Sequence, residues 1–160
     1  MRQHPQPRRT PDRLKDRPSW LLGRAAARAA ALLQAGFSAY GDGSLRGIHY
    51  RLLAALEQWG PSSQADLGRD TGIDPSDVTS ALADLEARDL VTREIDPGHR
   101  RRKIVSITPT GSATLRSLDK VLDGIQERLL EPLTATQRRQ LVAMMRRLAE
   151  QPPPDAGEPE

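Results

Sequence analysis

The chain has 160 residues, which is enough for one domain of ordinary size, and hydrophobic residues make up 37% of it. It contains no cysteine, so disulfides, thiolate zinc sites and cysteine-based peroxide sensing are excluded. Its formal net charge of +3 favours an anionic partner such as nucleic acid.

Several features argue against a membrane, metal or cofactor protein. No apolar run reaches the roughly 18 residues that a membrane span needs. Residues 1–17 lack the apolar centre of a secretory signal, so we expect a cytoplasmic location. The histidines His4, His49 and His99 are isolated in sequence, and we expect no metal site. The glycines of residues 40–44 are not followed by a phosphate-binding Lys-Ser/Thr pair, and we expect no cofactor.

Residues 1–17 combine prolines with basic side chains that outnumber the acidic ones, Asp12 and Asp16. This composition predicts a basic, disordered arm. Such an arm either adds salt-sensitive affinity for DNA or is an inert tail, and the sequence leaves both alternatives open.

The next two segments are predicted helices. Residues 20–37 are rich in alanine, with bulky apolar residues at both ends. Residues 45–59 follow Ser44, which is a suitable helix cap. Apolar residues recur at helical spacing in the second helix and predict its buried side. These residues are Ile48, Leu52, Ala55, Leu56 and Trp59.

Residues 63–87 predict two helices joined by a tight turn. Ser63 is a suitable N-cap for the first helix, with Asp66 as its capping-box partner, and Gly72 ends that helix. Asp74 then caps the second helix. Two helices joined by a short turn that contains glycine are typical of a helix-turn-helix.

The second of these helices has two distinct faces. An apolar stripe at helical spacing faces the core, and the opposite face is small and bears hydroxyl groups. Such a face can enter a DNA major groove, where Ser and Thr hydrogen-bond base edges. The alternative is a plain amphipathic surface helix. The apolar stripe is Val78, Ala81, Leu82 and Leu85, and the outer face is Ser76, Ser80, Ala83 and Ala87, with Thr79 on its flank.

A β-hairpin is predicted after this helix. Leu90, Val91 and Ile95 mark its first strand and residues 103–107 its second, and residues 96–102 form a basic loop between them. Three consecutive arginines at a hairpin tip are unfavourable unless an anion is near. A solvated charge run is the alternative. Next to a helix-turn-helix, contact with phosphates and the minor groove is favoured.

Three stretches together resemble the winged-helix core of MarR-type bacterial transcription regulators, namely residues 67–79, 85–93 and 100–111. The resemblance extends over residues 20–149. It implies a mainly α-helical fold with a small β-hairpin wing. The expected domain covers residues 18–150, with a winged helix-turn-helix at residues 45–111 and dimerisation helices at residues 20–37 and 109–149.

In that family the second helix of the pair reads the major groove, and a wing arginine enters the minor groove. By position, Arg101 matches that arginine, and His99 stands where the family usually places Asp. Family members often carry arginines on the recognition helix, at the positions held here by Pro75, Ser80 and Asp84. We therefore expect the wing, Arg69 and the N-terminal arm to attract the phosphates. The DNA contacts expected are Ser63, Gln64, Arg69, Ser76, Asp77, Thr79, Ser80, Arg100, Arg101 and Arg102.

MarR-like proteins often bind small aromatic acids in a cleft between the dimer helices and the DNA-binding lobe. The resemblance makes Trp20, Arg24, His49 and Arg51 candidates for that cleft. Arginine suits carboxylates because its planar fork matches them with two hydrogen bonds. The alternative is that His49 packs at the rim of the core and that both arginines are solvated.

Residues 109–149 predict two further helices. Thr108 caps the first, Pro132 ends it, and Thr134 caps the second. The first helix carries a coiled-coil-like seam of Leu115, Leu118, Leu122, Ile125 and Leu129. The second carries a stripe of Leu141, Met144, Met145 and Leu148. Residues 151–160 are predicted to be a disordered acidic tail.

These two stripes need a partner surface, because soluble monomers rarely leave large apolar patches exposed. We expect a homodimer whose two recognition helices meet half-sites about one DNA turn, or ~10 base pairs, apart. The sequence thus predicts a transcription regulator that binds a pseudo-palindromic operator. Regulators of the family that it resembles are most often repressors. A small aromatic ligand is the candidate that would release the protein from DNA. A winged-helix protein-interaction module is the alternative. An enzyme is not expected, since no nucleophile motif is present.

Overall fold

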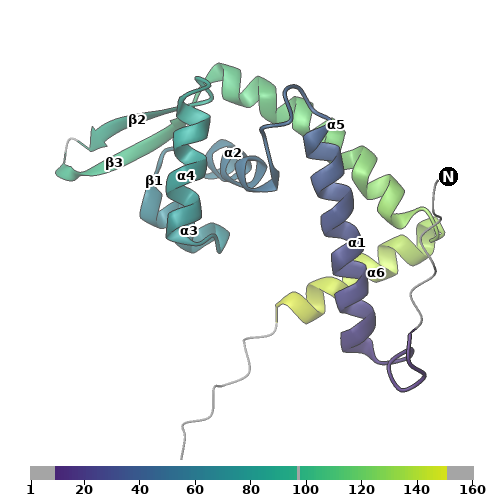
Figure 1. Ribbon diagram of the computed structural model, residues 1–160. Coiled ribbons are helices and arrows are strands. Elements are labelled where there is room, and N and C mark those ends of the chain that lie inside the picture. Colours follow the sequence, from purple (N-terminus) through teal and green to yellow (C-terminus); the bar gives the residue numbers. More distant parts are fainter. Residues whose placement is uncertain (1–9, 97, 151–160) are drawn as a thin grey trace, which may run out of the picture.

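The structure is a computed structural model that describes residues 10–96 and 98–150, apart from the side chains of residues 99–102. Figure 1 shows the helices and strands of this part of the chain. They are α1 (Pro18–Ser38), α2 (Gly47–Trp59), β1 (Ser62–Ser63), α3 (Gln64–Thr71), α4 (Pro75–Glu86), β2 (Val91–Asp96), β3 (His99–Ile107), α5 (Pro109–Leu130) and α6 (Ala135–Ala149).

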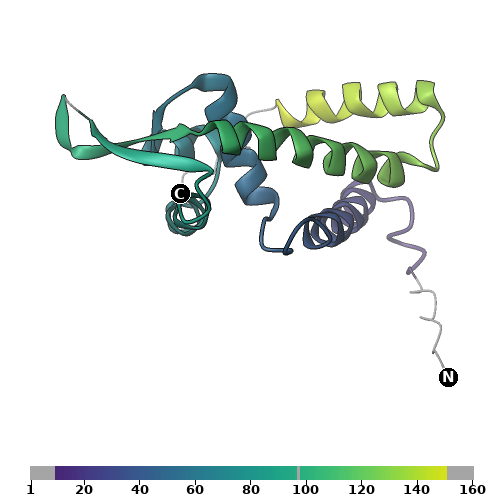
Figure 2. The same cartoon turned by 90° about the horizontal axis from the view of Figure 1, so that it is seen from above.

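The elements form a lobe and a helical extension, which α5 joins. The lobe contains α2, α3, α4 and the sheet, and the extension contains α1, α6 and the far half of α5 (Figure 1). Seen from above, the hairpin of β2 and β3 projects from one end of the molecule, and α6 turns back from the end of α5 (Figure 2). This arrangement confirms the predicted fold class, a mainly helical winged helix-turn-helix with terminal helices.

The hydrophobic core lies inside the lobe. Apolar side chains of α2, α3 and α4 meet those of the sheet and of the first half of α5 there. The largest side chains that are fully buried are Leu52, Leu53, Leu56, Leu67, Leu82, Leu85 and Leu118. Full burial of a leucine stabilises the fold by about 1.5–3 kcal/mol relative to exposure, so this cluster fixes how the lobe's helices are oriented.

The sheet has three antiparallel strands in the order β1-β3-β2. The two-residue strand β1 was not predicted. It pairs Ser62 with Val105 and Ser63 with Ile104. The predicted hairpin is confirmed, but its second strand begins at His99 rather than at residue 103. The run of arginines therefore belongs to β3 and not to a loop.

Most of the predicted helix starts are confirmed. The side chains of Ser63, Asp74, Thr108 and Thr134 each accept a hydrogen bond from a backbone N–H of the helix they cap. Ser44 does not cap α2, because its hydroxyl donates to Asp42 instead and the helix begins after Arg46.

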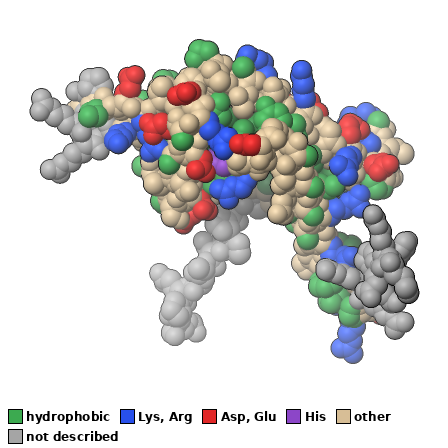
Figure 3. Space-filling model, turned by 45° about the horizontal axis from the view of Figure 1, so that its top comes forward, with side chains coloured by type: hydrophobic (Ala, Val, Ile, Leu, Met, Phe, Trp, Pro, Cys, Tyr) green, Lys and Arg blue, Asp and Glu red, His purple; other side chains and the backbone are tan. Residues whose placement is uncertain are grey.

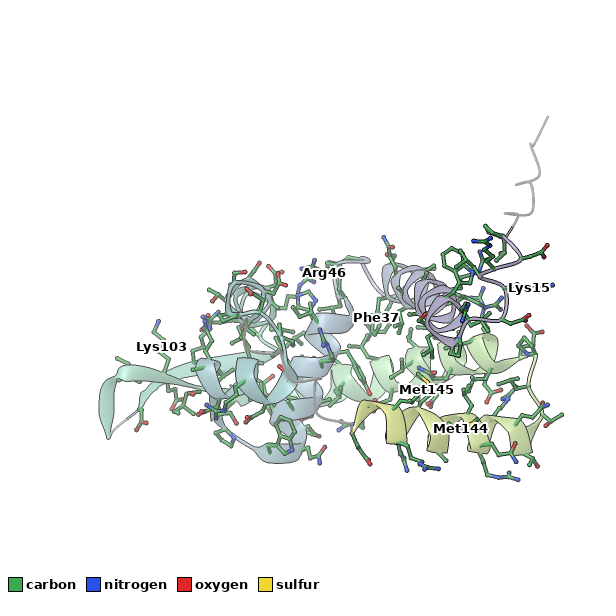
Figure 4. The ribbon with its side chains drawn as sticks, turned by 90° about the horizontal axis from the view of Figure 1, so that it is seen from below. Lys15, Phe37, Arg46, Lys103, Met144 and Met145 are labelled. Atoms are coloured by element: carbon green, nitrogen blue, oxygen red, sulfur yellow. The ribbon has the colours of Figure 1, made fainter. Side chains whose placement is uncertain are left out.

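The predictions about apolar surfaces differ in outcome. Trp59, predicted on the buried side of α2, is 53% exposed, because the last turn of that helix extends beyond the core. Three residues of the α5 stripe, Leu115, Leu118 and Ile125, are already buried within one protomer, so they do not need a partner surface. By contrast, no residue of α6 is buried, and Met144 and Met145 project from it (Figure 4).

Both chain ends carried predictions of disorder. Residues 1–9 and 151–160 lie outside the described part of the chain. The remainder of the predicted arm forms a turn over residues 12–16 just before α1. Among the described helices, none has the length and apolar character that crossing a bilayer requires.

Candidate DNA-binding surface

The first helix of the helix-turn-helix is held at both ends by its own residues. The hydroxyl of Ser63 accepts from the backbone N–H of Asp66 at 3.2 Å and donates to the Asp66 carboxylate at 2.6 Å. Gly72 ends α3 with a φ of 63°, in the left-handed region that glycine adopts without strain. Because Ser63 is buried and its hydroxyl is engaged, we correct its predicted role from a DNA contact to a helix cap.

Asp74 fixes the start of the recognition helix α4. Its carboxylate accepts from the backbone N–H of Ser76 at 2.8 Å and from the Ser76 hydroxyl at 2.6 Å. These hydrogen bonds from Ser76 hold the pKa of Asp74 below its usual range, because they stabilise the ionised form. The carboxylate therefore remains charged at the positive end of the helix dipole, where it stabilises the helix.

The two predicted faces of α4 are confirmed. Val78, Ala81, Leu82 and Leu85 are fully buried against the core. The opposite face is exposed, and its side chains are short, so the helix can approach a surface closely. The exposed residues are Ser76, Asp77, Thr79, Ser80 and Ala83.

Gln64 and Thr79 link the two helices at this surface. The Gln64 side-chain amide donates to the Thr79 hydroxyl at 2.6 Å, and that hydroxyl donates to the carbonyl oxygen of Pro75 at 2.8 Å. The structure thus brings two predicted DNA contacts together, one from the start of α3 and one from α4.

Arg69 lies on the exposed side of α3 and is held by two neighbouring carboxylates. Its guanidinium lies 2.7 Å from Asp66 and 3.3 Å from Asp70. Both pairs are at the surface, where an ion pair stabilises by about 0–1 kcal/mol. A phosphate can therefore replace either carboxylate at low cost.

The hairpin adds one described cation to this surface, Lys103, which is exposed on β3 (Figure 4). An open groove of about 1210 Å³ runs between Lys103, the exposed side of α3 and the start of α4. The side chains of Arg100, Arg101 and Arg102 lie outside the described part of the chain.

Sequence reasoning did not assign Lys103 to this surface. The signal was present, since Lys103 continues the basic run of residues 100–102. Its position depends on β1, because Ser63 pairs with Ile104 and so brings the hairpin stem beside the first turn of α3. A two-residue strand with no apolar pattern gives too weak a signal to predict that pairing.

The charges of this lobe are mixed. In the view of Figure 3, acidic and basic side chains alternate over the lobe rather than forming one basic patch. Asp77 and Asp84 are exposed on α4, and Glu86 pairs with Arg93 of β2 at 3.1 Å. This distribution agrees with the expectation that phosphate attraction does not come mainly from the recognition helix.

Comparison with known proteins identifies the family. The sequence model of the MarR family matches residues 44–102. The HTH-type transcriptional repressor NicR of Pseudomonas putida is 32% identical over 139 residues, a region that covers 87% of this chain and 86% of NicR. This chain belongs to the MarR family of transcriptional regulators. The predicted family is thus confirmed, and the relatives are DNA-binding regulators rather than enzymes.

Solved structures of MarR-like regulators share the fold. One is a structure of BpsR from Bordetella bronchiseptica, which concerns the regulation of its DNA binding by 6-hydroxynicotinic acid. BpsR is 28% identical to this chain with a TM-score of 0.72, and the match covers 82% of this chain and 98% of the BpsR chain. Another is the transcriptional repressor CouR bound to a 23-mer DNA duplex, 25% identical with a TM-score of 0.77, covering 87% of this chain and 96% of CouR.

The four residues predicted to line an effector cleft in this MarR-family chain do not come together within one protomer. Trp20 and Arg24 lie in the first turns of α1, whereas the other end of that helix meets α2, where the rings of Phe37 and Tyr50 are 6.2 Å apart. About 17 residues of helix separate Trp20 from Phe37, roughly 25 Å. The indole Nε1 of Trp20 is buried and has no hydrogen-bond acceptor among the described residues.

His49 has a structural position instead. Its side chain is fully buried, its Nδ1 accepts from the backbone N–H of Arg46 at 2.9 Å, and its Nε2 lies 3.4 Å from a carboxylate oxygen of Asp84. The first contact caps α2 and the second reaches the recognition helix. These contacts favour the alternative in which His49 packs against the core. Arg24 and Arg51 are exposed and remain candidates for the cleft.

The next residue of α2 contacts a different neighbour. The hydroxyl of Tyr50 donates to the carboxylate of Asp119 on α5 at 2.9 Å. Burial raises the pKa of Tyr50, as does this hydrogen bond, so the phenol remains a donor at neutral pH. Consecutive residues of α2 thus connect the recognition helix to the long helix that leaves the lobe. Sequence reasoning did not find this link, because the partners are far apart in the chain.

Proposed function

We propose that this chain is a homodimeric repressor that acts in the cytoplasm on a pseudo-palindromic operator and releases it when a small aromatic acid binds. The observation that carries the DNA-reading part is α4 itself, which buries a complete apolar stripe and presents short side chains on the opposite face, namely Ser76, Ser80 and Ala83. A helix of this kind can enter the major groove without steric obstruction. The family of this chain and its repressor relative NicR support the same function.

The exposed apolar surface of the extension supports the dimer. Leu21 and Leu22 of α1 are exposed, as are Val142, Met144, Met145 and Leu148 of α6. These residues carry no function within one protomer, and water-exposed apolar surface of this extent is unusual for a soluble monomer. Covering it with the same surface of a second copy gives a two-fold dimer whose α4 helices meet two half-sites.

A charge placed on α6 tests the dimer. Leu148 is 60% exposed in the single chain, and Leu148→Glu should raise the dimer dissociation constant by an order of magnitude or more, roughly the effect of losing one buried leucine per protomer. Sedimentation equilibrium at several concentrations measures this. The matched control is Ala143→Glu, which adds the same charge to the opposite side of α6. Equal dimerisation of both variants would contradict an interface through α6.

The wing prediction is tested by its arginine. Arg101→Ala should weaken binding to the DNA upstream of the chain's own gene about tenfold and reduce the slope of log K against log salt by about one, because one phosphate-region contact is lost. Fluorescence anisotropy over a salt series measures both quantities. Arg128→Ala is the control, since Arg128 is exposed near the end of α5, away from the lobe. Affinity and salt slope that are unchanged in Arg101→Ala would remove the wing from the interface.

The proposed effector is a hydroxylated aromatic or pyridine carboxylic acid. BpsR, whose DNA binding is regulated by 6-hydroxynicotinic acid, supports this class. Arg24 and Arg51 are exposed guanidinium groups on different helices, and either can pair with its carboxylate. By linkage, such an acid must bind more tightly to the conformation that binds DNA poorly. Titration of the DNA complex with 6-hydroxynicotinic acid, nicotinic acid and benzoic acid tests the class.

A protein-interaction module without specific DNA reading is the second candidate. The acidic side chains of α4 favour it, because Asp77 and Asp84 repel phosphates. Retention on heparin at low salt separates the two functions. A chain that elutes as a neutral protein of its size would support the interaction module.

A further inference from the structure

Thr79 is an exposed residue of α4 whose hydroxyl is already engaged inside the protein. Its Oγ1 donates to the carbonyl oxygen of Pro75 at 2.8 Å, one turn earlier in the same helix. The same oxygen accepts from the amide nitrogen of Gln64 at 2.6 Å. A hydroxyl has a single proton to donate, so Thr79 has no donor left for a base edge. The part of this side chain that has no polar partner is its Cγ2 methyl group.

The direction of each hydrogen bond follows from chemistry. The carbonyl oxygen of Pro75 can only accept, so the Thr79 proton points to it. Gln64 must then present its NH₂ group to the remaining lone pairs of the Thr79 oxygen. Through this hydrogen bond, Gln64 acts as a positioning residue that fixes the rotamer of Thr79.

The surroundings of Thr79 leave its methyl group accessible. Ala83 lies four residues later, on the same side of the helix, and its methyl group is exposed as well. Ser76 and Ser80, which are outward residues near them, are too short to cover these methyl groups. The longer neighbours are engaged elsewhere, since Glu86 pairs with Arg93 of β2 and Gln64 donates to the Thr79 oxygen. The outer face of α4 therefore contains a small apolar spot within a polar surface. In the major groove, the apolar group that a base presents is the C5 methyl of thymine.

We propose that Thr79 is a specificity-determining residue that, together with Ala83, contacts the C5 methyl of one thymine in each half-site. This proposal rests on the proposed function as a sequence-specific DNA-binding dimer. It assigns Gln64 to the positioning of Thr79. It assigns hydrogen-bond donation by a hydroxyl of this helix to Ser80, because the Ser76 hydroxyl donates to Asp74.

Deoxyuridine provides a direct test, because it pairs like thymine and lacks only the C5 methyl. The probe is a duplex enriched from a random-sequence pool by the full-length wild-type chain. Each thymine of the half-sites is replaced in turn, symmetrically, by deoxyuridine. At one position, affinity should fall about fourfold for each methyl group removed, or ~15-fold for the symmetric duplex. Fluorescence anisotropy at fixed salt measures this loss.

Two variants separate the methyl group from the hydroxyl. Thr79→Ser keeps both hydrogen bonds and removes the methyl group, so its preference for thymine over deoxyuridine at that position should shrink to the part that Ala83 contributes. Thr79→Val keeps a methyl group and removes the hydroxyl, so it should retain most of the wild-type preference. Ser80→Ala is the matched control on the same face and should retain the full preference. Circular dichroism shows whether each variant keeps its helices.

The outcomes distinguish this proposal from the proposed function. Failure to enrich any two-fold symmetric motif would overturn both. Enrichment of a symmetric motif supports the regulator, and the methyl contact is then overturned by any of three results. These are half-sites without thymine, affinity that no deoxyuridine substitution changes, and a deoxyuridine penalty that Thr79→Ser retains in full.

Discussion

Gly111→Ala is expected to lower the free energy of unfolding by about 2–3 kcal/mol, which is the usual cost of forcing extra atoms into a packed site. A Cβ atom at this position would lie 2.1 Å from the carbonyl oxygen of Leu90 and 2.8 Å from a side-chain carbon of Ile107. The Leu90 carbonyl cannot move away easily, because it accepts a hydrogen bond from the backbone N–H of Thr108 at 3.1 Å. Urea denaturation at a fixed protomer concentration measures the loss.

The same substitution further along α5 is the control. Gly124 has no neighbour within 4 Å of the position of an added Cβ. Gly124→Ala should therefore leave stability unchanged or raise it by about 0.5–1 kcal/mol, because alanine is the better helix former. If the two variants were equally stable, the close approach of α5 to the sheet would not be a constraint on the fold.

The position of Gly111 explains why this contact matters for function. The first turn of α5 follows directly on β3, and its N-terminal residues are held by the Thr108 cap, whose hydroxyl accepts from the Gly111 N–H at 2.9 Å. Thr108 also donates to the carbonyl oxygen of Asp89, beyond the end of α4. A displacement of α5 here would move α1 and α6 relative to the recognition helix. In the proposed dimer, the spacing of the two half-sites depends on that relation.

The sequence predicted the helix-turn-helix well because its signals are local. Asp74, Thr108 and Thr134 each cap the helix that directly follows them, and each cap involves residues no more than three positions apart. The faces of α4 follow from a spacing of three and four residues, which depends only on helix geometry. Such features can be predicted without knowing which distant segments meet.

What the sequence did not predict depends on distant contacts. Strand β1 exists only because Ser62 and Ser63 pair with a strand forty residues away in the chain. His49 could be read as an exposed ligand contact, and only the fold shows that Asp84 of another helix lies beside it and that the core covers it. Trp59 has helical spacing with the core residues of α2, but the core ends before its turn.

In the candidate site, too, local features could be predicted from the sequence and contacts between distant residues could not. The outward residues of α4 were predicted from periodicity and are exposed as expected. The hydrogen bond between Gln64 and Thr79 was not predicted, since it joins two helices through their side chains. Together with the hydrogen bond from Thr79 to the carbonyl oxygen of Pro75, this contact changes the chemistry that the surface offers, because the Thr79 hydroxyl has no proton left to donate to a base. The residue types at a recognition surface therefore do not by themselves show which of its groups can contact a base, because that also depends on the hydrogen bonds that those residues make within the protein.

The stability of the protein is expected to fall as the pH is lowered below 6.5, and His49 is the cause. Burial holds the pKa of His49 below 6.5 in the folded protein, with a contribution from the positive charges of Arg46 and Arg88. The hydrogen bond to Asp84 acts in the opposite direction and is outweighed. The folded state therefore keeps His49 neutral at a pH where the unfolded chain binds a proton.

The sign of the effect follows from proton counts. Above pH 6.5 neither state protonates His49, so its contribution is fully present. Below that pH the unfolded state binds more protons, and stability falls by up to ~1.4 kcal/mol per pH unit until the folded-state pKa is reached. The hydrogen bonds from Ser76 hold the pKa of Asp74 below 3.8, so the Asp74 carboxylate does not contribute to a slope measured between pH 7 and pH 5. Urea denaturation across this range measures the slope.

His49→Asn is the control that assigns the slope to this residue. Asparagine does not titrate, and its side-chain oxygen can still accept from the backbone N–H of Arg46, so the cap of α2 is kept. The variant is expected to be less stable at pH 7, because a buried ring is lost, yet its stability should change much less between pH 7 and pH 5. A slope equal to that of the wild type would assign the pH dependence to other histidines. A loss of the wild-type slope would show that burial of the His49 ring between the elements of the lobe, rather than its contact with Asp84, causes the pH dependence, because the Asp84 hydrogen bond acts against the shift.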